Sequence, residues 1–118
     1  MTMESSLNAL MAPLVGAHVF PDTAPFDTAR PYIVWQQIGG RSIDFIDPTV
    51  PSKQNAVMQI TAWADTRAAA KALILQIEAA LIQATTLQAR AVSASAADHD
   101  EDLKRYGARQ DFSIWADR

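Results

Sequence analysis

The segment that decides the fold is residues 56–84, which read AVMQITAWADTRAAAKALILQIEAALIQA. Residues 56–64 alternate in polarity with a period of two, which predicts a β-strand. One face of this strand presents Val57, Gln59, Thr61 and Trp63, and the other presents Met58, Ile60, Ala62 and Ala64. The second face is the more apolar, so we expect it to point into the core with a helix lying on it.

That helix is predicted directly after the strand. Alanine is the best helix former and recurs throughout residues 68–84. Asp65 is the predicted N-cap, because its side chain can accept a hydrogen bond from the first turn. The apolar stripe of the helix consists of Ala70, Ile74, Ile77 and Leu81, widened by Leu73 and Ala80. We expect Ile77 to face Ile60 across the interface between helix and strand.

The N-terminal part of the chain predicts a second helix and one further strand. Leucine and methionine at helical spacing indicate a helix over residues 4–12, capped by Ser5 or Ser6 and ended by Pro13. Residues 19–20 predict a brief strand. Residues 21–31 are rich in proline and aspartate and predict an irregular surface connection. Residues 32–38 are β-branched and aromatic and predict a strand that ends at Gly39-Gly40.

The connection over residues 41–55 is unusually long for a compact domain, which is typical of functional or mobile loops. It contains two prolines and four apolar side chains that a hairpin loop cannot easily bury by itself. We therefore predict that this connection is mobile in the free subunit and becomes ordered against a neighbouring subunit or another protein. The candidate interface residues are Ile43, Phe45, Ile46 and Val50.

The C-terminal part predicts a weak strand over residues 87–96, an acidic turn over residues 98–103 and a final strand over residues 106–115. The order of elements is therefore α-β-β-α-β-β. The predicted fold is an α+β single domain spanning residues 1–118, with a mostly antiparallel or mixed four-stranded sheet and two helices packed on one face.

Composition narrows the range of functions. The chain has 118 residues, of which 13 are acidic and 10 basic, so no basic excess favours nucleic-acid binding. It has no cysteine, which excludes disulfides and thiolate chemistry. The N-terminus lacks the pattern of a secretory signal. No apolar run reaches the roughly 20 residues that a membrane-spanning helix needs.

No catalytic, cofactor-binding or metal-binding residue is predicted. His99 lies among Asp98, Asp100, Glu101 and Asp102, which could offer metal ligands, but the spacing matches no calcium loop. A solvated turn is the simpler interpretation, and His18 lies far away in sequence. The chain contains no Gly-x-Ser-x-Gly elbow and no phosphate-binding loop. The three tryptophans are better explained by core or subunit-interface roles than by base stacking.

Four patches of sequence together resemble one protein family. They are Phe20-Pro21-Asp22, residues 30–35 (RPYIVW), residues 59–64 (QITAWA) leading into the alanine-rich helix, and residues 110–115 (QDFSIW). In their order, spacing and total length they resemble the tail-completion, or tail-terminator, proteins of long-tailed bacteriophages and prophages. The resemblance covers roughly residues 7–115.

The resemblance implies a structural virion assembly protein and no catalysis. Such proteins form a ring, typically a hexamer, on the end of the tail tube, where the ring stops elongation and provides the surface that joins the capsid connector. The implied partners are the tail-tube protein and the head connector protein, without specific nucleic-acid binding or membrane association. The implied location is the tail end of the virion, after assembly in the cytoplasm of the bacterial host. A small protein-interaction module of non-phage function is the alternative, and a small hydrolase or ligand-binding domain is a third hypothesis.

Overall fold

A computed structural model describes residues 2–118 of the chain. Within this range it contains two α-helices, one short 3-10 helix and six strands. In chain order they are α1 (Met3–Met11), the 3-10 helix η1 (Ala12–Leu14), β1 (Val19–Pro21), β2 (Tyr32–Gly39), β3 (Lys53–Ala64), α2 (Arg67–Ile82), β4 (Gln88–Ala91), β5 (Ala96–Asp100) and β6 (Arg105–Asp117).

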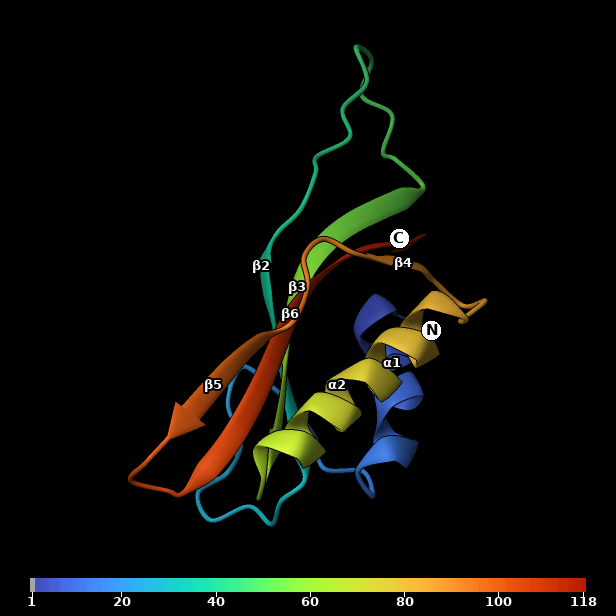
Figure 1. The fold of residues 1–118 in the computed structure, drawn as a ribbon. Coiled ribbons are helices and arrows are strands. Elements are labelled where there is room, and N and C mark those ends of the chain that lie inside the picture. The colour runs from blue at the N-terminus through green and yellow to red at the C-terminus, as the bar shows by residue number, and fades with distance from the viewer. Residues whose placement is uncertain (1) are drawn as a thin grey trace.

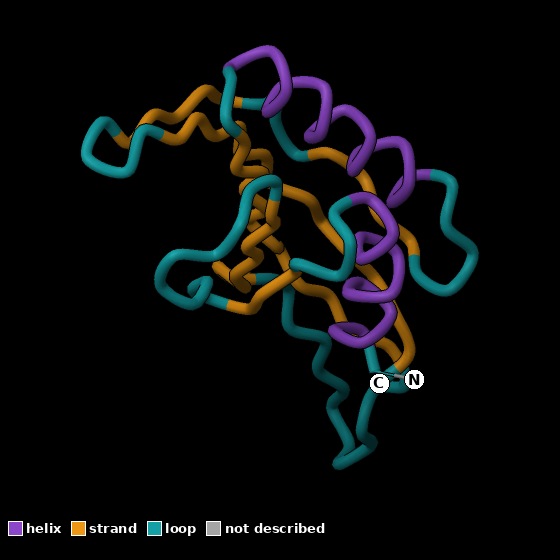
Figure 2. Tube along the Cα trace, turned by 90° about the horizontal axis from the view of Figure 1, so that it is seen from below, coloured by secondary structure: helices purple, strands orange, loops and turns teal. Residues whose placement is uncertain are grey.

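The strands form one mixed sheet, and both helices lie on the same face of it (Figures 1 and 2). The strand order is β1-β2-β3-β6-β4, with β5 also paired to β6. Only β1 and β2 are parallel, and all other pairs are antiparallel. The predicted α+β class and the placement of the helices are confirmed. The predicted four-stranded sheet is wrong: the brief strand near residues 19–20 joins one edge as β1, the third predicted strand is shortened to β4, and a further strand, β5, forms over the predicted acidic turn.

The central strand β3 has the two faces that its alternation predicts. Met58, Ile60, Ala62 and Ala64 are buried, whereas Val57, Gln59, Thr61 and Trp63 are half-buried. The even-numbered residues belong to the core cluster together with the buried residues of α1 and α2. Ile60 and Ile77, which we expect to face each other, are both fully buried members of this cluster. The face formed by the odd-numbered residues is therefore left without a helix.

Helix α2 begins one residue later than predicted. Its N-cap is Thr66, whose hydroxyl accepts a hydrogen bond of 3.1 Å from the backbone N–H of Ala69. Asp65 is not the cap, because its carboxylate pairs with Arg30 at 2.7 Å instead. The buried residues of α2 are Ala70, Leu73, Ile74, Ile77 and Leu81, as the apolar stripe predicts.

Helix α1 also differs from its prediction at the first turn. Thr2 is the N-cap, and it exchanges hydrogen bonds with Ser5 in a capping box. Ser5 is thus the third helical residue, and Ser6 is buried against the core. The helix ends at Met11, and Pro13 lies in the 3-10 turn that follows. The predicted effect of this proline on the helix is confirmed.

The acidic segment near the C-terminus is a strand rather than a turn. Residues 96–100 form β5 against β6, and the turn comprises residues 101–104. Between β4 and β5 the chain leaves the regular ladder but stays beside β6. Val92 N–H donates to the Asp111 carbonyl at 2.9 Å, and the Gln110 amide donates to the Ser93 carbonyl at 2.8 Å. These hydrogen bonds to β6 therefore keep residues 92–93 next to the sheet, although their composition does not predict a strand.

Candidate assembly interface

The connection between β2 and β3 projects well beyond the rest of the domain (Figure 1). We call residues 40–52 the arm. The arm contains neither helix nor strand. The predicted connection ran to residue 55, but residues 53–55 belong to β3. The arm thus projects from the packed sheet and helices without regular secondary structure of its own.

The arm exposes most of the apolar residues predicted for an interface. Ile46 is fully exposed, while Val50 and Phe45 are 71% and 53% exposed. Ile43 lies nearer the root of the arm and is half-buried. Large apolar side chains concentrated on one projecting segment are typical of protein–protein contact sites. The mobility of the arm in the free subunit stays a prediction.

The local sequence explains why the arm does not extend the hairpin. Pro48 and Pro51 have no backbone N–H to donate to a neighbouring strand. Asp47 instead accepts a hydrogen bond of 3.0 Å from the Thr49 N–H. Hydrogen bonding by Thr49 lowers the pKa of Asp47 below its ordinary value, because the bonds favour the charged form of the carboxylate. The tip of the arm therefore combines apolar side chains with a fixed negative charge.

Both legs of the arm are held where they meet the sheet. On one leg, Arg41 N–H donates to the side-chain Oδ1 of Asn55 at 2.9 Å. On the other, the carbonyl of Ser52 accepts from Arg118 N–H at 2.8 Å. Lys53 forms an ion pair with Asp117, and its hydrogen bond lowers the pKa of that carboxyl. The root of the arm is thus fastened to the C-terminal end of β6.

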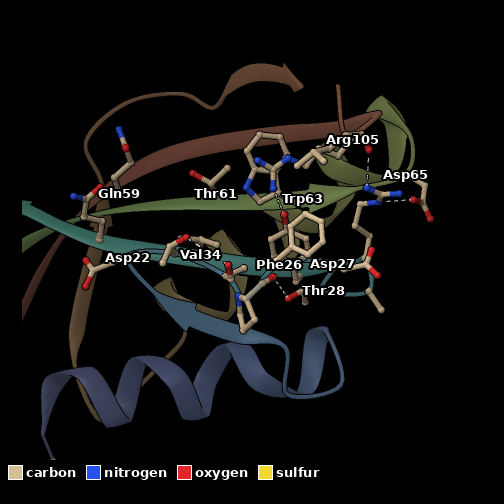
Figure 3. A pocket seen from close by; sticks show the side chains of 18 residues that line it. Asp22, Phe26, Asp27, Thr28, Val34, Gln59, Thr61, Trp63, Asp65 and Arg105 are labelled. Atoms are coloured by element: carbon tan, nitrogen blue, oxygen red, sulfur yellow. Dashed lines mark hydrogen bonds and ion pairs between the residues drawn. The ribbon is translucent and has the colours of Figure 1, made fainter. Parts of the chain in front are cut away.

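A second surface, a hollow, lies at the face of the sheet that the helices leave bare (Figure 3). The loop of residues 22–30 forms one wall, strands β2 and β3 form the floor, and the volume is about 910 Å³. The aromatic residue of this wall, Phe26, is 91% exposed. Arg30 holds the loop in place by bonding Asp65 at 2.7 Å and the Leu103 carbonyl at 3.1 Å.

The comparisons with known proteins identify the family. The sequence profile described as "Tail completion protein gp17" matches residues 5–117. The chain belongs to this family of bacteriophage tail completion proteins. Among solved structures, one chain of "Virion of native gene transfer agent (GTA) particle" matches with a TM-score of 0.55 and 22% identity, over 93% of this chain and 86% of that chain. This likeness concerns the fold alone. No curated protein gives a significant match.

In this tail completion protein the sequence predicted the arm but not the hollow. The four predicted interface residues all lie on the arm. The hollow was missed, because its parts come from loop 22–30, β2, β3 and Arg105, which only the folded chain brings together. The feature of the sequence that marks the hollow is the cluster of prolines and aspartates in residues 21–31, which we interpreted only as a surface connection.

The histidine-containing acidic segment of this tail completion protein has a structural role in the β5–β6 hairpin. The His99 ring stacks on Tyr106 with centroids 4.5 Å apart, and Asp100 pairs with Arg105 at 3.1 Å. In residues 2–118, no group of His, Cys, Asp and Glu side chains has the arrangement of a metal site. The same residues include no helix that is both long and apolar enough to cross a membrane.

Proposed function

We propose that this protein caps the end of the phage tail tube, stops its elongation and provides the surface that joins the tail to the capsid connector. The observation that carries the proposal is the match of residues 5–117 to the tail completion family. The structural neighbour comes from the virion of a gene transfer agent particle, and its likeness in fold supports a place in a tail assembly. The partners are the tail-tube protein and the head connector protein.

The arm is the proposed contact surface of the cap. Phe45, Ile46 and Val50 are exposed in the single subunit, and burying such side chains contributes roughly 1.5–3 kcal/mol each. A neighbouring subunit or the tube end would remove these side chains from water. Because the arm is fastened at its root and projects from the sheet (Figure 1), it can reach a surface beyond its own domain.

The proposed assembly is a ring of identical subunits, with six as the expected number. Head-to-tail contacts between different patches of one surface generate closed rings when the rotation closes. The arm and the bare face of the sheet are different patches of the same chain, which is the arrangement that such contacts require. In this proposal the ring is assembled in the cytoplasm of the bacterial host and takes its place at the tail end of the particle.

Oligomeric state and binding to tube ends test this proposal. Sedimentation of the purified protein over a range of concentrations is expected to show a closed ring species, alone or in the presence of tail tubes. Electron microscopy of labelled protein with purified tubes is expected to place it at one end of each tube. Label spread evenly along the tubes would contradict the proposal.

A further inference from the structure

The backbone pairing of β2 with β3 is followed by a hydrogen bond to a side chain, that of Asn55, and not by a tight turn. Gly39 is opposite Val57, so two residues further along Arg41 comes opposite Asn55. There the N–H of Arg41 donates to the side-chain Oδ1 of Asn55 at 2.9 Å. A side-chain acceptor thus stands where a backbone pair would continue the hairpin, and the arm leaves the sheet at this point.

Asn55 is itself held in one orientation by strand β6. Its Nδ2 donates to the Ser113 hydroxyl at 3.0 Å and to the Ile114 carbonyl at 3.1 Å. The residue is only 8% exposed, so a rotation of the amide would leave buried polar groups without partners. The amide of Asn55 therefore links the direction of the first leg of the arm to the rigid centre of the sheet.

Gly40 brings the backbone close enough for this link. A Cβ at position 40 would lie 2.5 Å from the Asn55 carbonyl oxygen, closer than real Cβ atoms approach a backbone oxygen. Glycine also tolerates the φ of +154° at this position. The contact therefore depends on the absence of a side chain at position 40.

We propose that Asn55 is the positioning residue of the arm: it fixes the direction in which the arm leaves the sheet while the tip stays free. This inference rests on the proposed capping function of the arm. A long loop without such a support would sample many directions, and ordering it on contact would reduce binding affinity. By fixing the root, Asn55 narrows the range of directions from which Phe45 and Ile46 can approach the assembly partner.

The direction of the leg can be measured by pulsed electron paramagnetic resonance. The chain has no cysteine, so spin labels at Ser42→Cys and Ala79→Cys report one defined pair of positions. Labelled protein is diluted with unlabelled protein so that only distances within one subunit are measured. The otherwise unmodified protein is expected to give one narrow distance distribution, and Asn55→Ala is expected to give a broad one.

Two further variants support the interpretation. Ser113→Ala is the matched control, because it removes one partner of the amide but leaves its bonds to Arg41 and Ile114; it is expected to keep the narrow distribution. Gly40→Ala displaces the same leg without removing the amide, so it is expected to broaden the distribution even if Asn55→Ala folds poorly.

Tail-tube capping by the same variants, without labels, links the direction of the arm to function. Asn55→Ala and Gly40→Ala are expected to cap tubes less efficiently at equal folded concentration, and Ser113→Ala is expected to cap normally. An unchanged narrow distribution in both Asn55→Ala and Gly40→Ala would overturn the positioning role. A broad distribution with normal capping would overturn the claim that the direction of the arm matters for capping. If Phe45→Ser with Ile46→Ser caps normally, the proposed function fails instead, whatever the distances show.

Discussion

The guanidinium carbon of Arg105 lies 4.1 Å from the centroid of the Trp63 ring, on the bare face of the sheet. The same guanidinium donates to the hydroxyl of Tyr32 and pairs with Asp100 at 3.1 Å. One side chain thus connects β6 to β3, β2 and β5. Stacking of this kind contributes about 0.5–2 kcal/mol, depending on how far the cation is desolvated.

Gly107 lies under the same tryptophan, which gives a test of this arrangement. A Cβ at position 107 would come within 2.9 Å of the Trp63 ring, so Gly107→Ala must displace the ring from its place beside Arg105. We expect a loss of about 1–3 kcal/mol in the free energy of unfolding, as for other overpacked sites. Urea denaturation measures the loss, and tryptophan fluorescence reports the displaced ring. The exposed Arg109→Ala on the same strand is the control, and equal stability of Gly107→Ala and the unmodified protein would contradict the arrangement.

The interface between α2 and the sheet gives a second test of stability. Ile77 is fully buried, so Ile77→Ala removes apolar contacts and leaves a cavity. We expect a loss of about 2–5 kcal/mol in the free energy of unfolding. Leu75 on the same helix is 52% exposed, and Leu75→Ala is expected to change stability by less than about 0.5 kcal/mol. Similar losses of unfolding free energy for the two variants in denaturant titrations would mean that the Ile77 face of α2 is not the one that packs against the sheet.

The sequence predicted these central elements well because each has a complete local signal. The alternation of β3 and the stripe of α2 each depend on residues close together in the chain, and both faces are confirmed by burial. Local reasoning was wrong where distant residues decide the outcome. Asp65 is a good cap by composition, but Arg30 binds it, so Thr66 caps the helix instead.

Strand β5 shows the same limit. Alanine, aspartate and histidine in residues 96–100 have low strand propensity, and composition alone favours a turn. The strand forms because β6 is long enough to pair with both β4 and β5. For the candidate interface, the sequence predicted the arm from apolar residues in a long connection that contains two prolines. The hollow could not be predicted, because its walls are remote from one another in sequence.

Titration of Asp100 gives a test of the β5–β6 turn. Its carboxylate accepts from the Leu103 N–H at 3.2 Å, and this bond, together with Arg105, lowers the pKa of Asp100 below its ordinary value. A lowered pKa in the folded state stabilises the turn above the unfolded pKa, and this contribution is lost as pH falls through the folded pKa. The Leu103 amide shift, followed by NMR, is therefore expected to titrate with a midpoint below the ordinary pKa of an aspartate. A midpoint at or above that ordinary value would contradict the hydrogen bond, and so would a Leu103 amide that titrates in the same way in Asp100→Asn.

Binding to DNA tests the electrostatic side of the proposal. A cap at the tube end must let DNA pass without holding it, and 13 acidic against 10 basic residues disfavour contacts with phosphates. We expect no measurable affinity for duplex DNA at physiological salt. Fluorescence anisotropy with a labelled duplex makes the measurement, and repeating it at low salt would reveal any weak attraction that salt screens. Tight binding to the duplex at physiological salt would contradict a cap that lets DNA pass without holding it.

The length of tail tubes tests the central claim most directly. Tube protein is polymerised with the unmodified protein, with Phe45→Ser and Ile46→Ser combined, or with Leu75→Ser, which removes an exposed apolar side chain of α2 away from the arm. Circular dichroism first confirms that all three proteins are folded. Electron microscopy is then expected to show tubes of limited length with the unmodified protein and with Leu75→Ser, and overgrown tubes with the arm variant or with no added protein. Tubes that grow to the same length with and without the unmodified protein would contradict the account.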